Sequence, residues 1–227
     1  MLLRKILLLG LAFLLLGLFI EISDDMQERD FDSFDSKIIT QVAKARVDAL
    51  NGPAIDITAL GSSTLITLFL IVALALLWLK REQFAAVYLL IGSIGAGLGT
   101  RFMKTVFARP RPTEVEPLIH ASGFSYPSGH SFGAASFYLL LMFLAWRYYR
   151  KLWQRVLIAT FALIIISLVC FSRVYLGVHY PMDVLAGALL GAAWVCLLTV
   201  AIFGQGWRSE IWKRTHKNEE AEFSTEP

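Results

Sequence analysis

The sequence contains few charged residues, few cysteines and no concentrated basic region. Only 17% of its 227 residues are charged and 56% are hydrophobic, whereas a soluble domain is usually nearer a quarter charged. The two cysteines, Cys170 and Cys196, both lie in apolar segments. This placement predicts buried thiols and gives no spacing for a disulfide framework or a metal site. The formal net charge of +3 is small and its basic residues are spread out, so nucleic-acid binding is not indicated.

What the sequence has instead is apolar segments approaching the ~20 residues that cross a bilayer. We expect six such helices, over residues 6–20, 57–79, 84–107, 127–146, 156–173 and 181–203. The first follows Arg4 and Lys5, as in a signal peptide, but no small-residue cleavage site follows it, which favours a retained helix. The sequence therefore predicts an all-α polytopic membrane protein. One six-span domain is expected over 1–203, with a polar cytoplasmic tail over 204–227.

Residues 21–56 are predicted to form an outward loop that contains an amphipathic helix. Ile38, Ile39, Val42 and Val47 fall roughly at helical spacing among charged residues. Such a helix either lies at the membrane interface or is a solvated loop helix without a lipid role. The run Asn51-Gly52-Pro53 is expected to end it.

The basic residues predict an orientation. With six spans, both termini and the loops 80–82 and 147–155 share one side, and these segments are rich in Lys and Arg. Such loops are usually cytoplasmic. We therefore expect cytoplasmic termini in a bacterial inner or plasma membrane, and polar motifs that face the periplasm or the exterior.

Three cations on that outward side are candidates for a binding site. Lys104, Arg111 and Arg173 come from three separate positions at predicted helix ends. One such residue could be a snorkelling anchor, but three beside two histidines and a carboxylate indicate a function. Phosphoryl transfer depends on positioning and on stabilising negative charge, which these groups supply. Because no carboxylate cluster lies nearby to hold Mg²⁺, we expect neither a metal nor a cofactor.

The run Pro127-Ser128-Gly129-His130 is expected to open the fourth helix. Proline suits the first helical position, and free amides at a helix start, here those of Ser128 and Gly129, bind anions. An ordinary helix start would have the same sequence pattern.

His179 is the better candidate for a nucleophile. Asp183 lies four residues later, in the first turn of a helix that Pro181 begins. A carboxylate on one ring nitrogen fixes the tautomer and leaves the other nitrogen free to attack. His130 has no carboxylate at such spacing and suits the general acid.

Two other histidines have no assigned role. His120 lies in the loop on the site's side, where contact with the substrate is an open possibility, and His216 lies in the charged tail.

Together the motifs have a recognisable order. Lys104 precedes Arg111-Pro112 by six intervening residues; Pro127-Ser128-Gly129-His130 follows; Ser172-Arg173, His179 and Asp183 complete the set. This order resembles the three-part signature of the type 2 phosphatidic acid phosphatase family, which includes bacterial acid phosphatases and vanadium haloperoxidases. The resemblance implies a helical bundle, a phosphohistidine on His179 oriented by Asp183, and His130 as acid and base. It also implies that phosphate is held by Lys104, Arg111, Ser128, Gly129 and Arg173.

In size and layout the chain is similar to the phosphatidylglycerophosphatase B and undecaprenyl-diphosphatase branch. The expected function is metal-independent hydrolysis of phosphatidylglycerophosphate, undecaprenyl diphosphate or phosphatidic acid, with no obligate protein partner. The alternatives are a lipid phosphotransferase, a haloperoxidase relative and a non-enzymatic carrier of lipid phosphates. The sequence leaves the lipid itself open.

Overall fold

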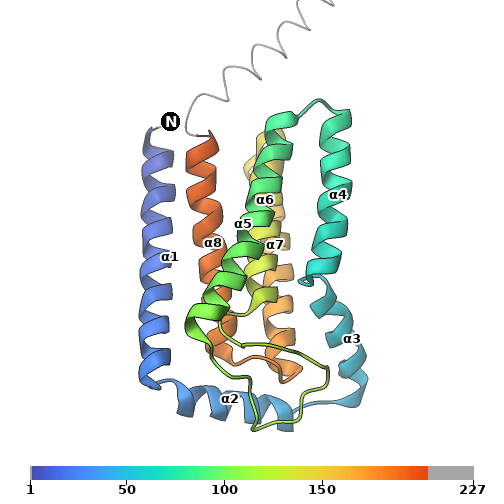
Figure 1. Ribbon diagram of the computed structural model, residues 1–227. Helices are drawn as coiled ribbons and strands as arrows, with labels where there is room; N and C mark the ends of the chain where they lie inside the picture. The colour runs from blue at the N-terminus through green and yellow to red at the C-terminus, as the bar shows by residue number, and fades with distance from the viewer. Residues whose placement is uncertain (1, 204–227) are drawn as a thin grey trace, which may run out of the picture.

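A computed structural model describes residues 2–203, and the predicted tail over 204–227 lies outside the described residues (Figure 1). The described part is helical, without strands. Its helices are α1 (Leu2–Glu28), α2 (Asp32–Lys44), α3 (Asp48–Ala59), α4 (Ser63–Leu79), α5 (Gln83–Phe107), α6 (Gly129–Tyr148), α7 (Leu152–Tyr175) and α8 (Pro181–Phe203).

Five of these helices, α1, α5, α6, α7 and α8, are long and apolar enough to cross a membrane. The bent pair α3 and α4 brings the number to six if it forms one span. The predicted all-α, multi-span fold is thereby confirmed. Helix α6 is central, because it packs against α4, α5, α7 and α8. Its side chains Phe137 and Leu140 are buried in one apolar core with Tyr88, Val169 and Val195.

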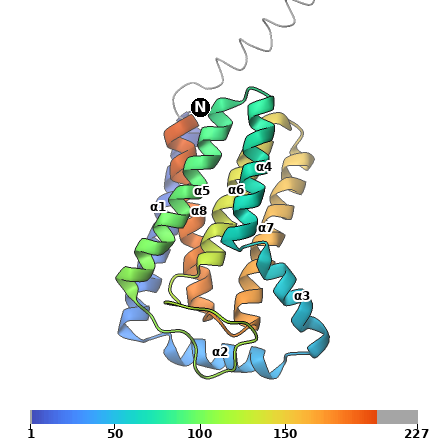
Figure 2. The same ribbon diagram turned by 45° about the vertical axis from the view of Figure 1, so that its right-hand side comes forward.

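The bundle has two distinct ends (Figures 1 and 2). The start of α1, the end of α8, and the α4–α5 and α6–α7 connections lie at one end. Helix α2 and the long segment 108–128 lie at the other. Because the connections alternate in this way, the start of α1 and the end of α8 share one end and the predicted motifs gather at the opposite end.

The second span is broken, which differs from the continuous helix expected over 57–79. Helices α3 and α4 meet at 47°. Ser62 caps α4, since its hydroxyl accepts a hydrogen bond from the Leu65 amide at 3.2 Å. Gly61 permits close packing at the break: a Cβ there would lie 2.5 Å from Val169 Cγ1 and 3.1 Å from the His130 carbonyl.

Two predicted helix boundaries were wrong. Asn51-Gly52-Pro53 does not end a helix but lies inside α3, where Pro53 lacks the amide that would donate to the carbonyl four residues earlier. Pro127 is not the first residue of α6. Ser128 is its N-cap, and the Ser128 hydroxyl accepts from the Ser131 amide.

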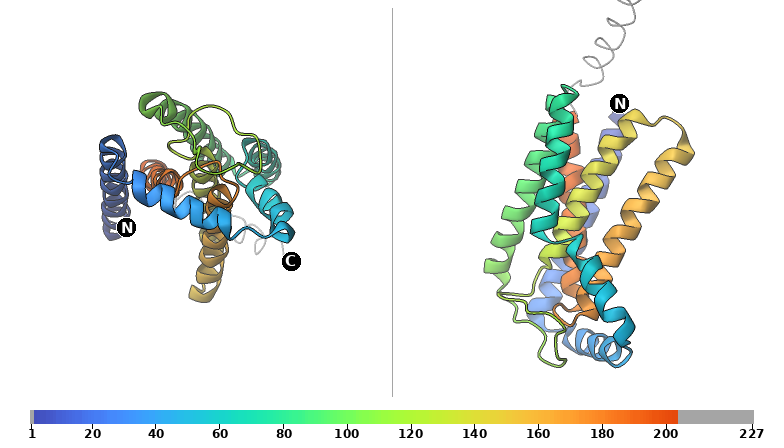
Figure 3. Two further views of the ribbon diagram at one scale, coloured as in Figure 1. Left: turned by 90° about the horizontal axis from the view of Figure 1, so that it is seen from below. Right: turned by 90° about the vertical axis from the view of Figure 1, so that its right-hand side faces the viewer.

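Helix α2 occupies the middle of residues 21–56, where an outward loop with an amphipathic helix was predicted, and α1 and α3 extend into the two ends of that range. Helix α2 lies across the end of the bundle, as the view from below shows (Figure 3). Ile39 is fully buried against Val174 and Val184, and Asp35 is also fully buried. Phe34, on another face, is exposed. A buried carboxylate on this helix requires partners in the bundle.

Candidate active site

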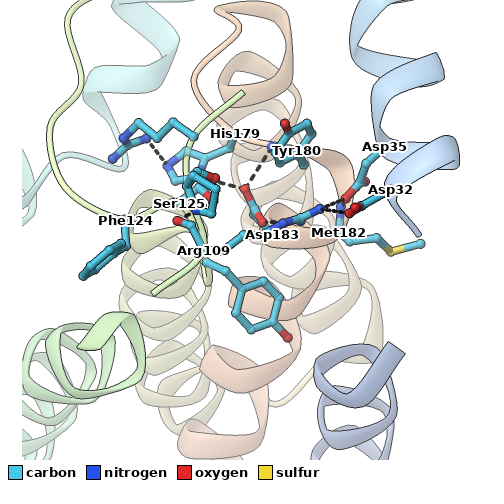
Figure 4. Close-up of polar contacts among 12 residues, drawn as sticks. Asp32, Asp35, Arg109, Phe124, Ser125, His179, Tyr180, Met182 and Asp183 are labelled. Atoms are coloured by element: carbon cyan, nitrogen blue, oxygen red, sulfur yellow. Dashed lines mark hydrogen bonds and ion pairs between the residues drawn. The ribbon is translucent and has the colours of Figure 1, made fainter. Parts of the chain in front are cut away.

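The predicted site residues come together at the end of the bundle where α2 lies. Figure 4 labels His179 and Asp183 among them. Lys104 comes from α5, His130 from α6, Arg173 from α7 and Asp183 from α8. His179 lies in the short turn between α7 and α8, where Gly177 adopts a left-handed backbone conformation, with φ of +77°. Helices separated in the chain therefore supply one polar cluster.

His179 has its two ring nitrogens in different surroundings. Its Nδ1 lies 3.4 Å from Asp183 Oδ2, and its Nε2 lies 3.3 Å from Arg111 Nη1. The Nδ1–Oδ2 distance is long for a hydrogen bond, as is often seen at catalytic pairs before substrate binds. Burial lowers the pKa of His179 to about 4, against the opposing effect of Asp183, so the imidazole is neutral near pH 7.

Backbone carbonyls of the segment 108–128 hold two of the cations. Arg111 donates to the carbonyls of Ser122 at 2.9 Å and Gly123 at 3.0 Å, and to that of Val178 at 2.7 Å. Lys104 donates to the carbonyls of Phe124 and Ser125. Burial lowers the pKa of Arg111, but a guanidinium remains charged at neutral pH.

Arg173 reaches the site from the end of α7 and is 3% exposed. Its Nη1 donates to Thr58 Oγ1 of α3 at 2.8 Å, whereas its Nε has no hydrogen-bond partner among the described residues. A buried donor without a partner is costly. An anion at this place would satisfy it.

The start of α6 offers fewer free backbone amides than the sequence predicted. The Ser128 amide donates to the Asp183 carbonyl at 2.9 Å. It is therefore not free to bind an anion, contrary to the prediction. The Ser128 hydroxyl accepts from the amide and hydroxyl of Ser131, which leaves its own proton available. A Cβ at Gly129 would lie 3.9 Å from Lys104 Cε, which places this glycine beside that cation.

His130 lies within electrostatic range of Arg173, His179, Arg111 and Lys104. Among the described residues, the charged groups that act on His130 include no carboxylate. His120, by contrast, is exposed in its loop.

Sequence reasoning missed two residues that join the cluster, Arg109 and Asp35. Arg109 donates from Nη1 to Asp183 Oδ1 at 2.7 Å and from Nη2 to Asp35 Oδ2 at 2.8 Å. Its guanidinium also lies 4.3 Å from the centroid of the Tyr180 ring. A signal for Asp35 existed, because it precedes the apolar Ile39 by four residues and so shares its helix face.

Burial and direct contacts both affect the pKa values of Asp35 and Arg109. Burial raises the pKa of the Asp35 carboxyl, and hydrogen bonds from Arg109 and the Met182 amide oppose that rise. For Arg109, burial acts to lower the pKa, but Asp183 and Asp35 together raise it. Both Asp35 oxygens accept from donors, as an ionised carboxylate does.

Comparison with known proteins gives consistent results. Residues 85–207 match the family model of the PAP2 superfamily. The chain is 32% identical over 160 residues to phosphatidylglycerophosphatase B of Bacillus subtilis, covering 70% of this chain and 78% of that protein. It is 30% identical over 207 residues to an undecaprenyl-diphosphatase of Sulfolobus acidocaldarius, covering 86% and 90%.

A solved structure has the same fold. The crystal structure of a transmembrane PAP2 type phosphatidylglycerolphosphate phosphatase from Bacillus subtilis superposes with a TM-score of 0.81 at 28% identity. The match covers 86% of this chain and 98% of that chain.

Proposed function

The chain belongs to the PAP2 superfamily and is a membrane lipid phosphatase, and we propose that it forms a phosphohistidine on His179. The proposed substrate is a phosphate or diphosphate monoester of a membrane lipid. Phosphatidylglycerophosphate, undecaprenyl diphosphate and phosphatidic acid are the candidates. The first two correspond to the names of the similar proteins from Bacillus subtilis and Sulfolobus acidocaldarius.

The observation that carries the mechanism is the orientation of His179. Its Nδ1 faces a carboxylate oxygen and its Nε2 faces the Arg111 guanidinium. The lone pair of neutral Nε2 can therefore attack a phosphorus atom that the guanidinium holds. The new N–P bond forms as the bond from phosphorus to the lipid oxygen breaks, and Asp183 stabilises the positive charge that develops on the ring.

His130 completes the proton balance. In the first step it gives a proton to the departing lipid oxygen. In the second step the now neutral His130 takes a proton from a water molecule, whose oxygen attacks phosphorus and breaks the N–P bond. Inorganic phosphate leaves, and both histidines return to their starting state.

The fixed cations lower the barrier of both steps. A phosphoryl group in transfer spreads negative charge over its equatorial oxygens, and preorganised positive groups stabilise that charge. Lys104, Arg111 and Arg173 act electrostatically on His130, and Arg111 and Arg173 also act on His179, which supports this role. Arginine adds geometric selectivity, because its planar group binds two phosphate oxygens at once.

The placement at one end of the bundle suits a lipid headgroup. The phosphate would enter among the polar residues of the segment 108–128 while the hydrocarbon tail stays between helices. From the basic residues at the opposite end, we propose that this end faces the periplasm or exterior and that the termini are cytoplasmic.

The test is phosphate release by the purified protein from the candidate lipids, with His179→Ala beside it. We expect His179→Ala to abolish release, and the exposed loop variant His120→Ala to retain it as a matched control. Full activity in a folded His179→Ala protein would exclude the mechanism. Labelled phosphate that appears on a second lipid, and not as free phosphate, would assign a phosphotransferase instead.

A further inference from the structure

A buried chain of charges extends from His179 through α8 to helix α2 (Figure 4). Asp183 contacts His179 through Oδ2 and Arg109 through Oδ1. Arg109 then contacts Asp35 of α2. The side chains of Asp183 and Asp35 have no exposed surface, and that of Arg109 is 6% exposed. Ion pairs so shielded from solvent are little screened, and loss of one partner has a large effect.

The hydrogen bonds fix both carboxylates in orientation. Asp183 Oδ2 accepts from the Tyr180 amide at 2.9 Å while Oδ1 accepts from Arg109. Asp35 Oδ1 accepts from the Met182 amide at 3.1 Å while Oδ2 accepts from Arg109. Thus the first turn of α8, which carries Asp183, is also tied directly to α2.

The charge count explains why a second carboxylate matters. Arg109 with Asp183 alone would be neutral, whereas the two buried carboxylates and one guanidinium leave a formal charge of −1, before the exposed Asp32 that also faces Arg109 is counted. When His179 forms its N–P bond, positive charge develops on the imidazole. If Arg109 neutralised Asp183 fully, Asp183 would stabilise the positive imidazole poorly. Asp35 offsets the charge of Arg109 and so preserves the negative field of Asp183 at His179.

A second contact between α2 and the site lies next to the first. Ser36 donates to Glu114 at 2.8 Å, and the Tyr180 hydroxyl donates to the same carboxylate at 2.9 Å. Tyr180 in turn lies against the Arg109 guanidinium. Asp35 therefore contacts Arg109 directly, and its neighbour Ser36 is linked to Arg109 through Glu114 and Tyr180.

We propose that Asp35 and Arg109 are positioning residues of the phosphatase reaction, through which helix α2 orients Asp183 and maintains its negative field toward His179. The proposal rests on the proposed phosphohistidine mechanism. It assigns a catalytic purpose to an amphipathic helix that lies outside the sequence motifs.

The test is Asp35→Asn, which keeps the shape of the side chain and removes its charge. We expect kcat to fall at least about tenfold with KM changed less than about twofold, because outer partners of site residues have effects of this size. Inhibition by inorganic phosphate is measured on the same protein. It should be retained within about threefold, because Lys104, Arg111 and Arg173 are untouched.

Asp32→Asn is the matched control. Asp32 also faces Arg109 Nη2, at 3.5 Å, but its side chain is 52% exposed. Solvent screens such a contact, so we expect kcat to change less than about twofold.

Three results would overturn the proposal. An Asp35→Asn protein with unchanged kcat would show that the chain of charges has no effect. Equal loss of kcat and of phosphate inhibition would show a merely structural role. Activity in His179→Ala would instead remove the proposed mechanism, and this result is distinguishable because it does not involve Asp35.

Arg109→Lys decides the matter if Asp35→Asn cannot be obtained folded. Lysine keeps the charge, but a single ammonium cannot bridge Asp35 and Asp183 as the two guanidinium nitrogens do. We expect a lower kcat with phosphate inhibition retained, and full activity would overturn the proposal.

Discussion

A histidine nucleophile needs one ring nitrogen held and the other left free, and His179 meets that requirement through local chain geometry. Pro181 begins α8, and Asp183 lies in its first turn, close enough for its carboxylate to face His179 Nδ1. His130 reaches the same place from α6, and among the described residues the charged groups that act on it are Arg173, His179, Arg111 and Lys104. The two histidines therefore have different surroundings, which suits one for attack and the other for proton transfer.

His130→Ala should affect lipid monoesters more than lipid diphosphates. A monoester releases an alkoxide, which needs a proton from the general acid, whereas a diphosphate releases a phosphate group whose pKa is near 6. We expect kcat/KM to fall about 10²–10⁴-fold for phosphatidic acid and at least about tenfold less for undecaprenyl diphosphate. Initial rates on both lipids at low concentration measure this. Equal losses would argue against His130 as the acid for the leaving group.

Chelation should leave the activity unchanged. Lys104, Arg111 and Arg173 supply fixed positive charge at the site, so the proposed steps require no divalent ion. We expect phosphate release with EDTA to stay within about 20% of the rate without it. This corresponds to a change of about 0.1 kcal/mol in the activation free energy. A loss of activity that Mg²⁺ restores would contradict this, and a metal-dependent phosphatase assayed in parallel confirms that chelation is complete.

At the scale of helices, apolar length predicted the spans, and tertiary contacts produced the features that the sequence did not reveal. Helix α5 begins within one residue of its predicted start and ends at Phe107, as expected. The α3–α4 break was missed because Gly61 is needed only where Val169 and His130 approach it. Spacing within one segment identified Asp183, whereas Arg109 and Asp35 are 74 residues apart and meet only in the fold.

The contact between α6 and α8 sets the distance between Ser128 and Asp183. A Cβ at Gly187 would lie 2.5 Å from the Ser128 carbonyl and 3.2 Å from the Phe132 amide, both of which are backbone atoms. Neither can move without a shift of the start of α6. This shift would also strain the bond from the Ser128 amide to the Asp183 carbonyl.

Gly187→Ala should therefore lower both stability and turnover. Overpacking of this kind costs about 1–3 kcal/mol, so we expect a lower Tm in detergent and a kcat/KM reduced about tenfold. Gly10→Ala on α1 is the control, since nothing lies within 4 Å of a Cβ at that position. Wild-type turnover in Gly187→Ala would show that the spacing of α6 and α8 does not limit the reaction.

At the scale of the whole molecule, the two ends of the bundle differ in chemistry. The proposed site and α2 occupy one end, and both described termini lie at the other (Figure 1). Outside the site cluster of Lys104, Arg109, Arg111 and Arg173, the site end has five basic residues, and the end with the termini has eight, in the start of α1 and in the α4–α5 and α6–α7 connections. In the described chain these eight residues are Arg4, Lys5, Lys80, Arg81, Arg147, Arg150, Lys151 and Arg155. This excess of basic residues predicts that the end with the start of α1 and the end of α8 is cytoplasmic.

Single cysteines at the two ends should react oppositely with a membrane-impermeant maleimide on intact cells. Glu116 lies exposed in the segment 108–128, and Lys151 lies exposed between α6 and α7. We expect Glu116→Cys to be labelled on intact cells and Lys151→Cys only after permeabilisation, because we propose that the site end faces outward. The parent protein is the control for background, since Cys196 is buried in α8 and Cys170 is partly buried in α7. Labelling in the reverse order would place the site in the cytoplasm, and the enzyme would then act on lipid phosphates of the inner leaflet.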